Sequence, residues 1–535
     1  MSQAEQNPPV AAPETQPVAA VTARIASIGV SDYRAFPSGQ NYEFNLGADG
    51  RNLLLFGENG SGKTTLFRAL RDLMALRPPP ENFAELRNAF AAGEEGFVSV
   101  QLTAGSVMEF RWDYGDTHPR STGGQPYVAL AERCRFLDYR ALLETNFVHR
   151  ASTPNLFDLL INEVLRDLPV IVHGRQDRLG IVYDRMRNAK PLNHRGRHNL
   201  RKADSACETF NTVLANHLPE VVAEGQQLMA KLGYDGISFD LKPGTVGYDR
   251  NLRDFVGKEI GLSVTLYAKP IERPQSFLNE ARLTALALAI YFAAARLVLK
   301  PPSVGSDGST MTRLLVLDDV LIGLDLSNRL PVLKLLNDEF SDWQILLFTY
   351  DRVWFDLARE YTEHTGRWAY LALRELPASS GQPGRPHVEP CADLLGVAER
   401  HLQSGDLMAA AVYIRAAFET RIKNVCRDQG VKIPYKPDPK DVKIDQLWEA
   451  IVGRQRTRQA NGDNDFIDPV LMNEVETVRS TVLNRLSHSG TPTLVSSEVK
   501  VALETVTKLQ RHEFKKSKNR ASRACRQKTL NRTEP

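Results

Sequence analysis

Hydrophobic and polar positions divide the chain into a mixed α/β part followed by a helical part. Short apolar runs alternate with turns up to about residue 135, and residues 97–115 predict a hairpin. The pattern then becomes helical and polar until about residue 233. Later segments predict strands again, around a long apolar helix that begins near residue 279, and everything from about residue 391 to 509 has a helical pattern. The predicted later strands cover residues 236–244, 261–271, 314–317 and 343–351.

These patterns predict an α/β domain, a linker and an all-α domain. The first residues are rich in Pro, Ala and Gln, with neither the basic nor the apolar segment of a signal peptide, so we expect a disordered leader. A stretch rich in Pro, Gly and Ser is typical of a linker. The expected organisation is a leader at 1–21, an α/β domain at 22–374 with a helical insertion at about 136–233, a linker at 375–390, a helical domain at 391–509 and a basic tail at 510–535.

Composition narrows the class of protein. A chain of 535 residues with 42% hydrophobic and 24% charged residues is typical of a globular protein with two or three domains. Its five cysteines are scattered without a C-x-x-C pair, which favours a reducing cytoplasm over a disulfide framework or a zinc site. The most apolar run, residues 283–295, is too short to span a bilayer, so we expect no membrane segment.

The net charge of +3 is unevenly distributed. From Lys508 onward the chain has ten Lys and Arg against Glu513 and Glu534, a local charge of +8. Such a tail either binds the phosphate backbone of DNA or RNA or serves as a solubilising end.

A complete phosphate-binding motif, GENGSGKTT, occupies residues 57–65. It follows the apolar strand 53–56 and precedes an amphipathic helix, which is the context that G-x-x-x-x-G-K-[ST] requires. We expect Lys63 to reach the β- and γ-phosphates of ATP and the Thr64 hydroxyl to bind Mg²⁺. The residues expected to contact the nucleotide from this motif are Gly57, Glu58, Asn59, Gly60, Ser61, Gly62, Lys63, Thr64 and Thr65.

Two adjacent carboxylates, Asp318 and Asp319, end the apolar strand at 314–317. Burying two neighbouring carboxylates is costly unless a cation balances them. We expect Asp318 to hold Mg²⁺ through a water and Asp319 to orient or deprotonate the attacking water, so that Lys63 and Asp319 are the catalytic residues. The alternative is a helix N-cap followed by a solvated neighbour.

Over residues 22–374 the chain resembles the ABC-type ATPases of the SMC–RecF–OLD group. The resemblance lies in three features: Lys63 and Asp318 are 255 positions apart, an insertion lies between them, and the segment FLNEARLTALALAIYFAA precedes the acidic strand. It implies an α/β, ABC-type P-loop ATPase head that forms an ATP-dependent homodimer or higher oligomer. In this group a signature sequence opens the long helix, and here Asn279 stands at the place of its serine. The resemblance implies that Asn279 contacts the γ-phosphate of ATP on a second protomer; an N-cap of a core helix is a compatible alternative.

Three further segments carry the resemblance. Residues 323–325 (GLD) are similar to the loop that crosses the dimer interface. Tyr350 occupies the place of a switch histidine and cannot act as a base at neutral pH, which is consistent with slow or gated hydrolysis. Residues 31–36 (SDYRAF) resemble the segment that covers the nucleotide, with Arg34 as a phosphate contact.

The short insertion resembles the arm-poor members of the group, in particular the ATPase subunits of Septu-like and retron-associated anti-phage systems. The C-terminal helices resemble HEPN-like domains, but Arg479, Asn484 and His488 do not reproduce the spacing of the HEPN ribonuclease motif. We therefore expect a binding or oligomerisation module there, with His488 as a helix C-terminal histidine.

The resulting hypothesis is an ATPase that gates a partner effector, such as a nuclease, in anti-phage defence. A DNA-repair or recombination ATPase that clamps DNA directly is the alternative. A toxin whose C-terminal helices cut RNA is a third hypothesis.

Overall fold

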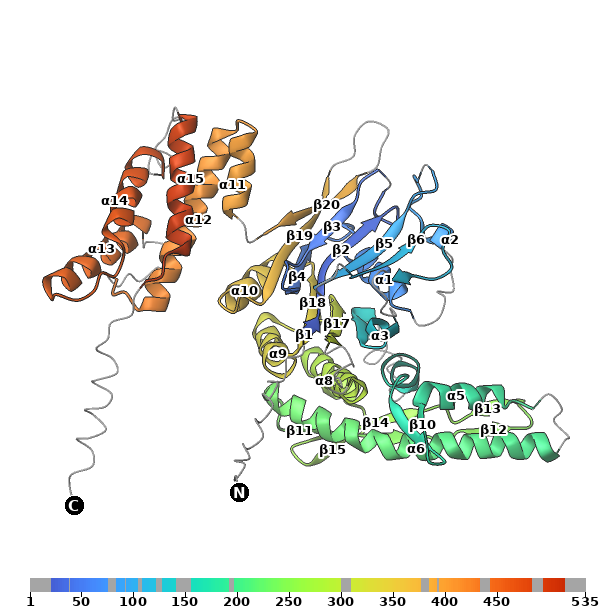
Figure 1. Cartoon of the computed structure of the whole chain (residues 1–535). Coiled ribbons are helices and arrows are strands. Elements are labelled where there is room, and N and C mark those ends of the chain that lie inside the picture. Colours follow the sequence, from blue (N-terminus) through green and yellow to red (C-terminus); the bar gives the residue numbers. More distant parts are fainter. Residues whose placement is uncertain are drawn as a thin grey trace, which may run out of the picture. The chain divides into compact units, whose positions relative to one another are not determined.

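The structure is a computed structural model in two compact units, Met1–Pro390 and Cys391–Pro535 (Figure 1). The leader up to residue 20, residues 377–383 of the expected linker, Asn484, His488 and the tail from residue 515 lie outside the described residues. The expected linker also included residues 375–376 and 385–390, which the structure places in the paired strands β19 and β20. The structure describes residues 21–37, 39–75, 83–91, 93–103, 108–121, 128–140, 155–191, 197–299, 309–376, 384–391, 394–433, 443–483 and 494–514.

A six-stranded sheet forms the centre of the first unit, in the order β20-β19-β4-β18-β17-β8. Its strands are parallel except for β20, which runs antiparallel to β19. The strands β4, β17 and β18 are buried along their whole length, which explains why they read as continuous apolar runs. The bounds are β4 Asn52–Gly57, β8 Cys134–Asp138, β17 Arg313–Asp318, β18 Trp343–Thr349, β19 Trp368–Leu376 and β20 Arg385–Pro390.

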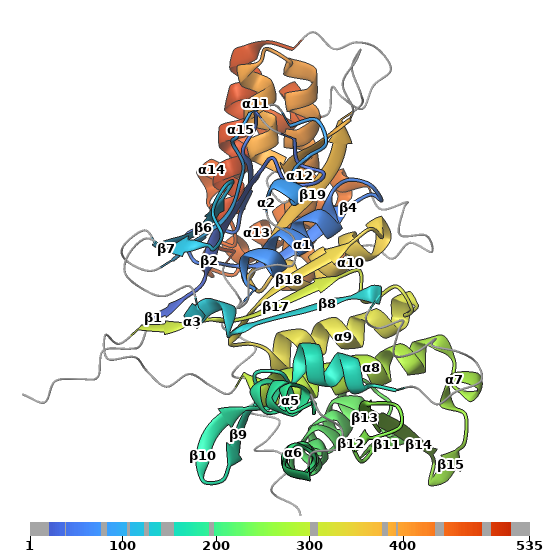
Figure 2. The ribbon, with the colours of Figure 1, turned by 90° about the vertical axis from the view of Figure 1, so that its right-hand side faces the viewer.

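An antiparallel five-stranded sheet, β3-β2-β5-β6-β7, shares a hydrophobic core with the central sheet. Helix α1, Lys63–Leu73, contributes to that core, and Figure 2 shows α8 and α9 beyond the central strands on the side away from α1. The hairpin predicted at 97–115 is confirmed as β5–β6. The remaining bounds in this part are β1 Val21–Ala23, β2 Ile25–Ser31, β3 Tyr42–Asn45, α2 Phe83–Leu86, β5 Phe97–Leu102, β6 Met108–Asp113, β7 Arg120–Ser121, α3 Val128–Ala131, β16 Ser309–Met311, α9 Leu326–Glu339 and α10 Arg352–Glu363.

The insertion between β8 and β17 combines a helical hairpin with small antiparallel sheets. Its longest element, α6, spans Arg197–Lys231, packs on α5 and α8, and contains Pro219. The side chain of Asn211 connects α6 to the segment just before β12 by two hydrogen bonds with the backbone of Val246. The other bounds are η1 Asp158–Val164, β9 Pro169–Val172, β10 Arg175–Arg178, α5 Leu179–Asn188, β11 Ile237–Pro243, β12 Gly247–Asp249, β13 Asp254–Val256, β14 Ile260–Leu266, β15 Lys269–Ile271, α7 Pro274–Phe277 and α8 Glu280–Val298.

Helix α8 is a core helix of the first unit. Within the described ranges it is the one helix long and apolar enough to cross a membrane, but 78% of its most apolar window is buried inside the fold. It has 19 residues, more than the 13 of the apolar run in the sequence. Burial against neighbouring elements accounts for its composition.

The second unit is all-α in its described part, with a core built around Phe418, Trp448 and Phe466. Together with the first unit it confirms the expected order of an α/β domain that contains an insertion, followed by an all-α domain. Its elements are α11 Leu394–Gln403, α12 Leu407–Gln429, α13 Ile444–Ala460, α14 Pro469–Val478, the π-helical turn η3 Arg479–Leu483 and α15 Ser496–Arg511.

Candidate nucleotide site

The phosphate-binding motif forms a tight loop between β4 and α1. Gly60 and Gly62 have φ of 89° and 107°, a region that residues with a Cβ rarely adopt. A Cβ on Gly57 would lie 2.5 Å from Ser61 Oγ and 3.0 Å from the carbonyl oxygen of Leu373. The loop therefore folds closely onto the end of β4, and the first turn of α1 leaves backbone N–H groups without intrahelical partners.

Lys63 is the first residue of α1 and only 4% exposed. Its ammonium group donates to the carbonyl oxygens of Gly57, at 2.6 Å, and Glu58, at 3.3 Å. The same nitrogen lies 3.8 Å from Asp319 Oδ2. The lysine thus bridges the phosphate loop and the acidic pair.

The parallel register brings the ends of β4 and β17 to one edge of the sheet, where Thr64 meets Asp318. The Thr64 hydroxyl donates to Asp318 Oδ2 at 2.8 Å, although 254 residues separate the two positions. Among the described residues, the other oxygen, Asp318 Oδ1, is buried without a hydrogen-bond partner. Burial, together with the charge of Asp319, raises the pKa of Asp318 to about 6, against the opposing effects of Thr64 and Lys63. A hydroxyl beside an orphaned buried carboxylate oxygen is a donor set that fits Mg²⁺.

Asp319 has a φ of 54°, an uncommon conformation that Asp tolerates better than most residues. Its Oδ1 accepts a hydrogen bond from the backbone N–H of Tyr350 at 2.9 Å. Burial raises the pKa of Asp319, and the charge of Lys63 opposes that shift. The strained backbone and the Tyr350 contact together fix this carboxylate next to Lys63.

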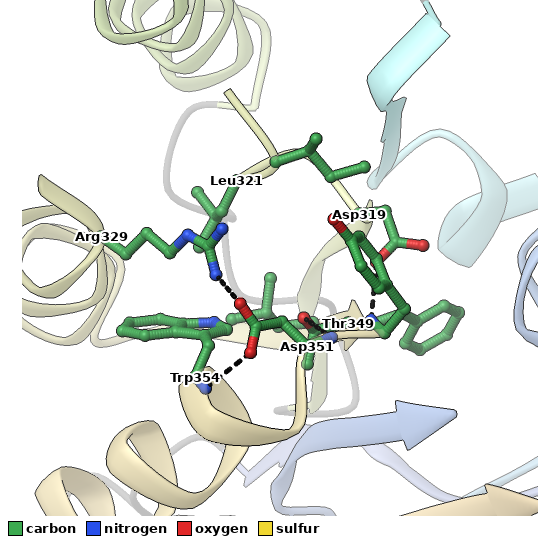
Figure 3. A pocket seen from close by; sticks show the side chains of 10 residues that line it. Asp319, Leu321, Arg329, Thr349, Asp351 and Trp354 are labelled. Carbon is green, nitrogen blue, oxygen red and sulfur yellow. Dashed lines mark hydrogen bonds and ion pairs between the residues drawn. The ribbon is translucent and has the colours of Figure 1, made fainter. Parts of the chain in front are cut away.

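A cavity of about 10 Å³ lies beside Asp319, which is room for about one water (Figure 3). Figure 3 shows Arg329 reaching Asp351 across it; their ion pair measures 2.6 Å. Asp351 also caps α10 by accepting from the backbone N–H of Trp354. This network links the start of α9 to the start of α10 just behind the acidic pair.

The structure does not join Asn279 to this group of residues. Its side chain is exposed and caps α8, accepting from the backbone N–H of Arg282 at 3.0 Å, as the alternative interpretation expected. The segment after the acidic pair packs on the same helix, because a Cβ on Gly323 would lie 2.4 Å from Thr284 Oγ1. The same Cβ would lie 3.3 Å from the side chain of Glu280, so the first two turns of α8 lie against the loop that follows Asp319.

The segment 31–36 lies against the phosphate loop. A Cβ on Gly62 would lie 3.4 Å from the ring of Phe36. Arg34 has a φ of 47°, and its backbone N–H donates to the carbonyl oxygen of Leu86. The nearby position of this segment is compatible with the expected phosphate contact of Arg34.

Asp138 is a residue of the site that sequence reasoning missed. It ends β8, in register with Asp318 on the neighbouring strand, and its charge contributes to the raised pKa of Asp318. The signal in the sequence is a short run, CRFLD, that ends in a carboxylate. Three acidic residues from two adjacent strands therefore gather at this edge.

No protein-family profile matches the chain, and no curated protein sequence matches it. Similar solved structures include a Smc head domain with an extended coiled coil bound to the C-terminal domain of ScpA, derived from Pyrococcus furiosus (12% identity, 71% of this chain and 99% of that chain, TM-score 0.39). An SMC head domain from Thermotoga maritima matches at 12% identity over 69% of this chain and 98% of its own, with a TM-score of 0.32. The recombination mediator protein RecF with ATPrS matches at 12% identity over 68% and 98%, with a TM-score of 0.41.

Proposed function

We propose that this protein is an ATPase of the SMC/RecF type that binds Mg-ATP between two copies of the chain. The observation that carries the proposal is the hydrogen bond of Thr64 to Asp318 beside the buried Lys63, at the end of a complete phosphate loop. Thr64 and Asp318 would hold Mg²⁺, which supplies charge neutralisation for the β- and γ-phosphates. ATP contacts residues 57–65.

In this proposal the ammonium group of Lys63 donates to phosphate oxygens when ATP is bound, instead of to the carbonyl oxygens of its own loop. Asp319 holds the attacking water or accepts its proton, since its carboxylate is fixed by Tyr350 N–H next to Lys63. Tyr350 contributes a backbone contact here, and its phenol supplies no base at neutral pH. Hydrolysis is therefore expected to be slow unless a partner completes the site.

The second copy would supply Asn279 to the γ-phosphate. Apolar side chains are exposed around the loop that follows the acidic pair, which is costly in water and favours an interface. They are Ile322 at 40%, Leu326 at 41%, Tyr350 at 38% and Val353 at 67% exposure. Because the closed dimer binds ATP, added ATP would shift the equilibrium between monomer and dimer toward the dimer by mass action.

We propose that ATP binding and hydrolysis control the activity of a partner effector such as a nuclease. The protein would act in the cytoplasm as part of anti-phage defence. This assignment rests on the resemblance stated for the sequence, with the helical unit as the binding or oligomerisation module. The alternative is a repair-type ATPase that clamps DNA directly.

The test combines native mass determination with an ATPase assay on the full chain. The parent should be a dimer or larger in Mg-ATP, and Asp318→Asn should lose Mg-dependent nucleotide affinity. Asp319→Asn should keep that affinity, form the ATP-bound oligomer and lose turnover. Equal turnover in the parent and Asp319→Asn would contradict the assignment of Asp319. Purification from the native host with Mg-ATP then separates the two functions: a stoichiometric nuclease supports effector gating, whereas DNA alone supports the clamp.

A further inference from the structure

The indole of Trp354 lies in the wall of the small cavity beside Asp319 (Figure 3). Trp354 is the third residue of α10 and is fully buried, with an exposed fraction of 0%. Its backbone N–H donates to Asp351, but its indole Nε1 is buried without a hydrogen-bond partner among the described residues. Buried indole N–H groups usually find an acceptor, because a buried donor left unpaired is costly. This donor therefore needs an acceptor that the described side chains do not supply.

The cavity has the size and the polar lining that suit a water as this acceptor. Its volume of about 10 Å³ is room for about one water. A buried water makes about three hydrogen bonds, and this site offers it an indole donor together with carboxylate acceptors. A water here would accept from Trp354 and donate to Asp319. The polar residues that line the cavity are Asp319, Arg329, Thr349, Tyr350 and Asp351.

The Arg329 side chain, which is 10% exposed, holds the indole in place. Its Nε donates to the carbonyl oxygen of Leu324 at 2.7 Å, and its Nη1 donates to Asp351 Oδ2 at 2.6 Å. The guanidinium carbon lies 6.0 Å from the centre of the Trp354 ring. Since Asp351 also accepts from the Trp354 backbone, the arginine and the indole are both fixed to one carboxylate.

This support matters because Asp319 changes partners in the reaction proposed above. Its Oδ1 accepts from the Tyr350 N–H, and its Oδ2 lies 3.8 Å from the ammonium group of Lys63. Once Lys63 donates to phosphate oxygens, the carboxylate depends more on its other donors. A misplacement of about 1 Å can cost about 100-fold in rate, so a carboxylate that orients water has to be held closely.

We propose that Trp354 is a positioning residue, which holds the Asp319 carboxylate for hydrolysis through a water in this cavity. The Arg329–Asp351 pair keeps the indole at the place where it meets that water. This inference rests on the proposed ATPase function and adds to it a residue outside the sequence motifs. Trp354 acts through Asp319 and is not itself catalytic.

The test compares Trp354→Phe with Trp368→Phe in the full chain. Phe keeps an aromatic ring at either position and removes the indole N–H. Trp368 is the matched control, because it is 2% exposed, donates to Asn337 at 3.0 Å and pairs with Asn52, at the end of β4 opposite to the phosphate loop. In Mg-ATP, Trp354→Phe should lower kcat about tenfold or more and leave KM within about twofold, because the lost contact acts on hydrolysis and not on binding. Trp368→Phe should leave both constants within about twofold.

A second measurement follows the indole itself. The chain has five tryptophans, so isotope-labelled indole groups give five NMR signals, which single substitutions assign. Asp319→Asn should shift the Trp354 signal, because it changes the group on the other side of the bridging water. The Trp368 signal should stay in place.

The outcomes separate this proposal from a merely structural role. An unchanged kcat in Trp354→Phe, or the same loss in both variants, would overturn the positioning role. A Trp354 signal that does not respond to Asp319→Asn would overturn the water contact, even if Trp354→Phe failed to fold. A parent that neither binds nor hydrolyses Mg-ATP would instead contradict the proposed function, and the indole signal would still test the contact.

Discussion

The close approach of Gly323 to α8 leads to a prediction about both the melting temperature and the rate of ATP hydrolysis. In Gly323→Ala the new methyl group would lie 2.4 Å from Thr284 Oγ1. Thr284 is 4% exposed and β-branched, so its χ1 is restricted in the helix and its side chain has little room to turn away from the new methyl group. The φ of Gly323 lies outside the left-handed region, so the penalty arises from packing alone.

Overpacking of this kind costs about 1–3 kcal/mol. With about 2.1 cal/mol/K of unfolding entropy per residue, the unit Met1–Pro390 changes its free energy by about 0.8 kcal/mol per degree. Gly323→Ala should therefore lower the melting temperature of this unit by about 1–4 °C in calorimetry. Because the same loop carries Asp319, the rate of ATP hydrolysis should fall while the affinity for ATP stays close to the parent's.

Thr284→Ala provides the decisive control, because it removes the atom that the new methyl group meets. In that background, adding Gly323→Ala should cost less than about 0.5 kcal/mol, so the pair should show a coupling energy of at least about 0.5 kcal/mol. If Gly323→Ala costs the same with and without Thr284, the loop does not pack on α8 as described and the reasoning is refuted.

Three further substitutions test other parts of the molecule. Asn279→Asp should leave the melting temperature unchanged, because Asp also caps helices. It should lower the rate of ATP hydrolysis at least about tenfold if a second copy presents this side chain to a phosphate. An unchanged rate would leave Asn279 with the capping role alone. Asp138→Asn should raise the Mg²⁺ concentration needed for half-maximal turnover by about 10-fold or more, in a metal titration, because the carboxylate stands beside Asp318. Arg479→Met should destabilise the helical unit by about 1–2 kcal/mol in urea unfolding, since Arg479 pairs with the half-exposed Asp445 and Glu476; a change below about 0.3 kcal/mol would contradict a structural role for these pairs.

The sequence was sufficient to predict the phosphate loop and the acidic strand as parts of one site. Both are local motifs, and parallel strands place their carboxyl ends at one edge, so the Thr64–Asp318 contact followed without knowledge of the chain between these two positions. Asp138 was missed because one Asp after a short apolar run is common; only its register with β17 makes it part of the site. The approach of Gly323 to Thr284 could not be predicted either, since it depends on how a loop and a helix pack.

Because α6 is long, a small bend in this helix produces a large displacement at its end. At about 1.5 Å per residue its 35 residues extend about 52 Å, and its C-terminal end is tied to α9 by the Lys231–Glu339 ion pair. Pro219 lacks the N–H for one helical hydrogen bond, so bending is concentrated at that point. A bend of about 10° there would move the start of the helix by about 6 Å, since about 22 residues lie beyond the proline. The part of α6 before Pro219 can therefore swing through several ångströms while the other end stays attached to the C-terminal end of α9, the helix that follows the acidic pair.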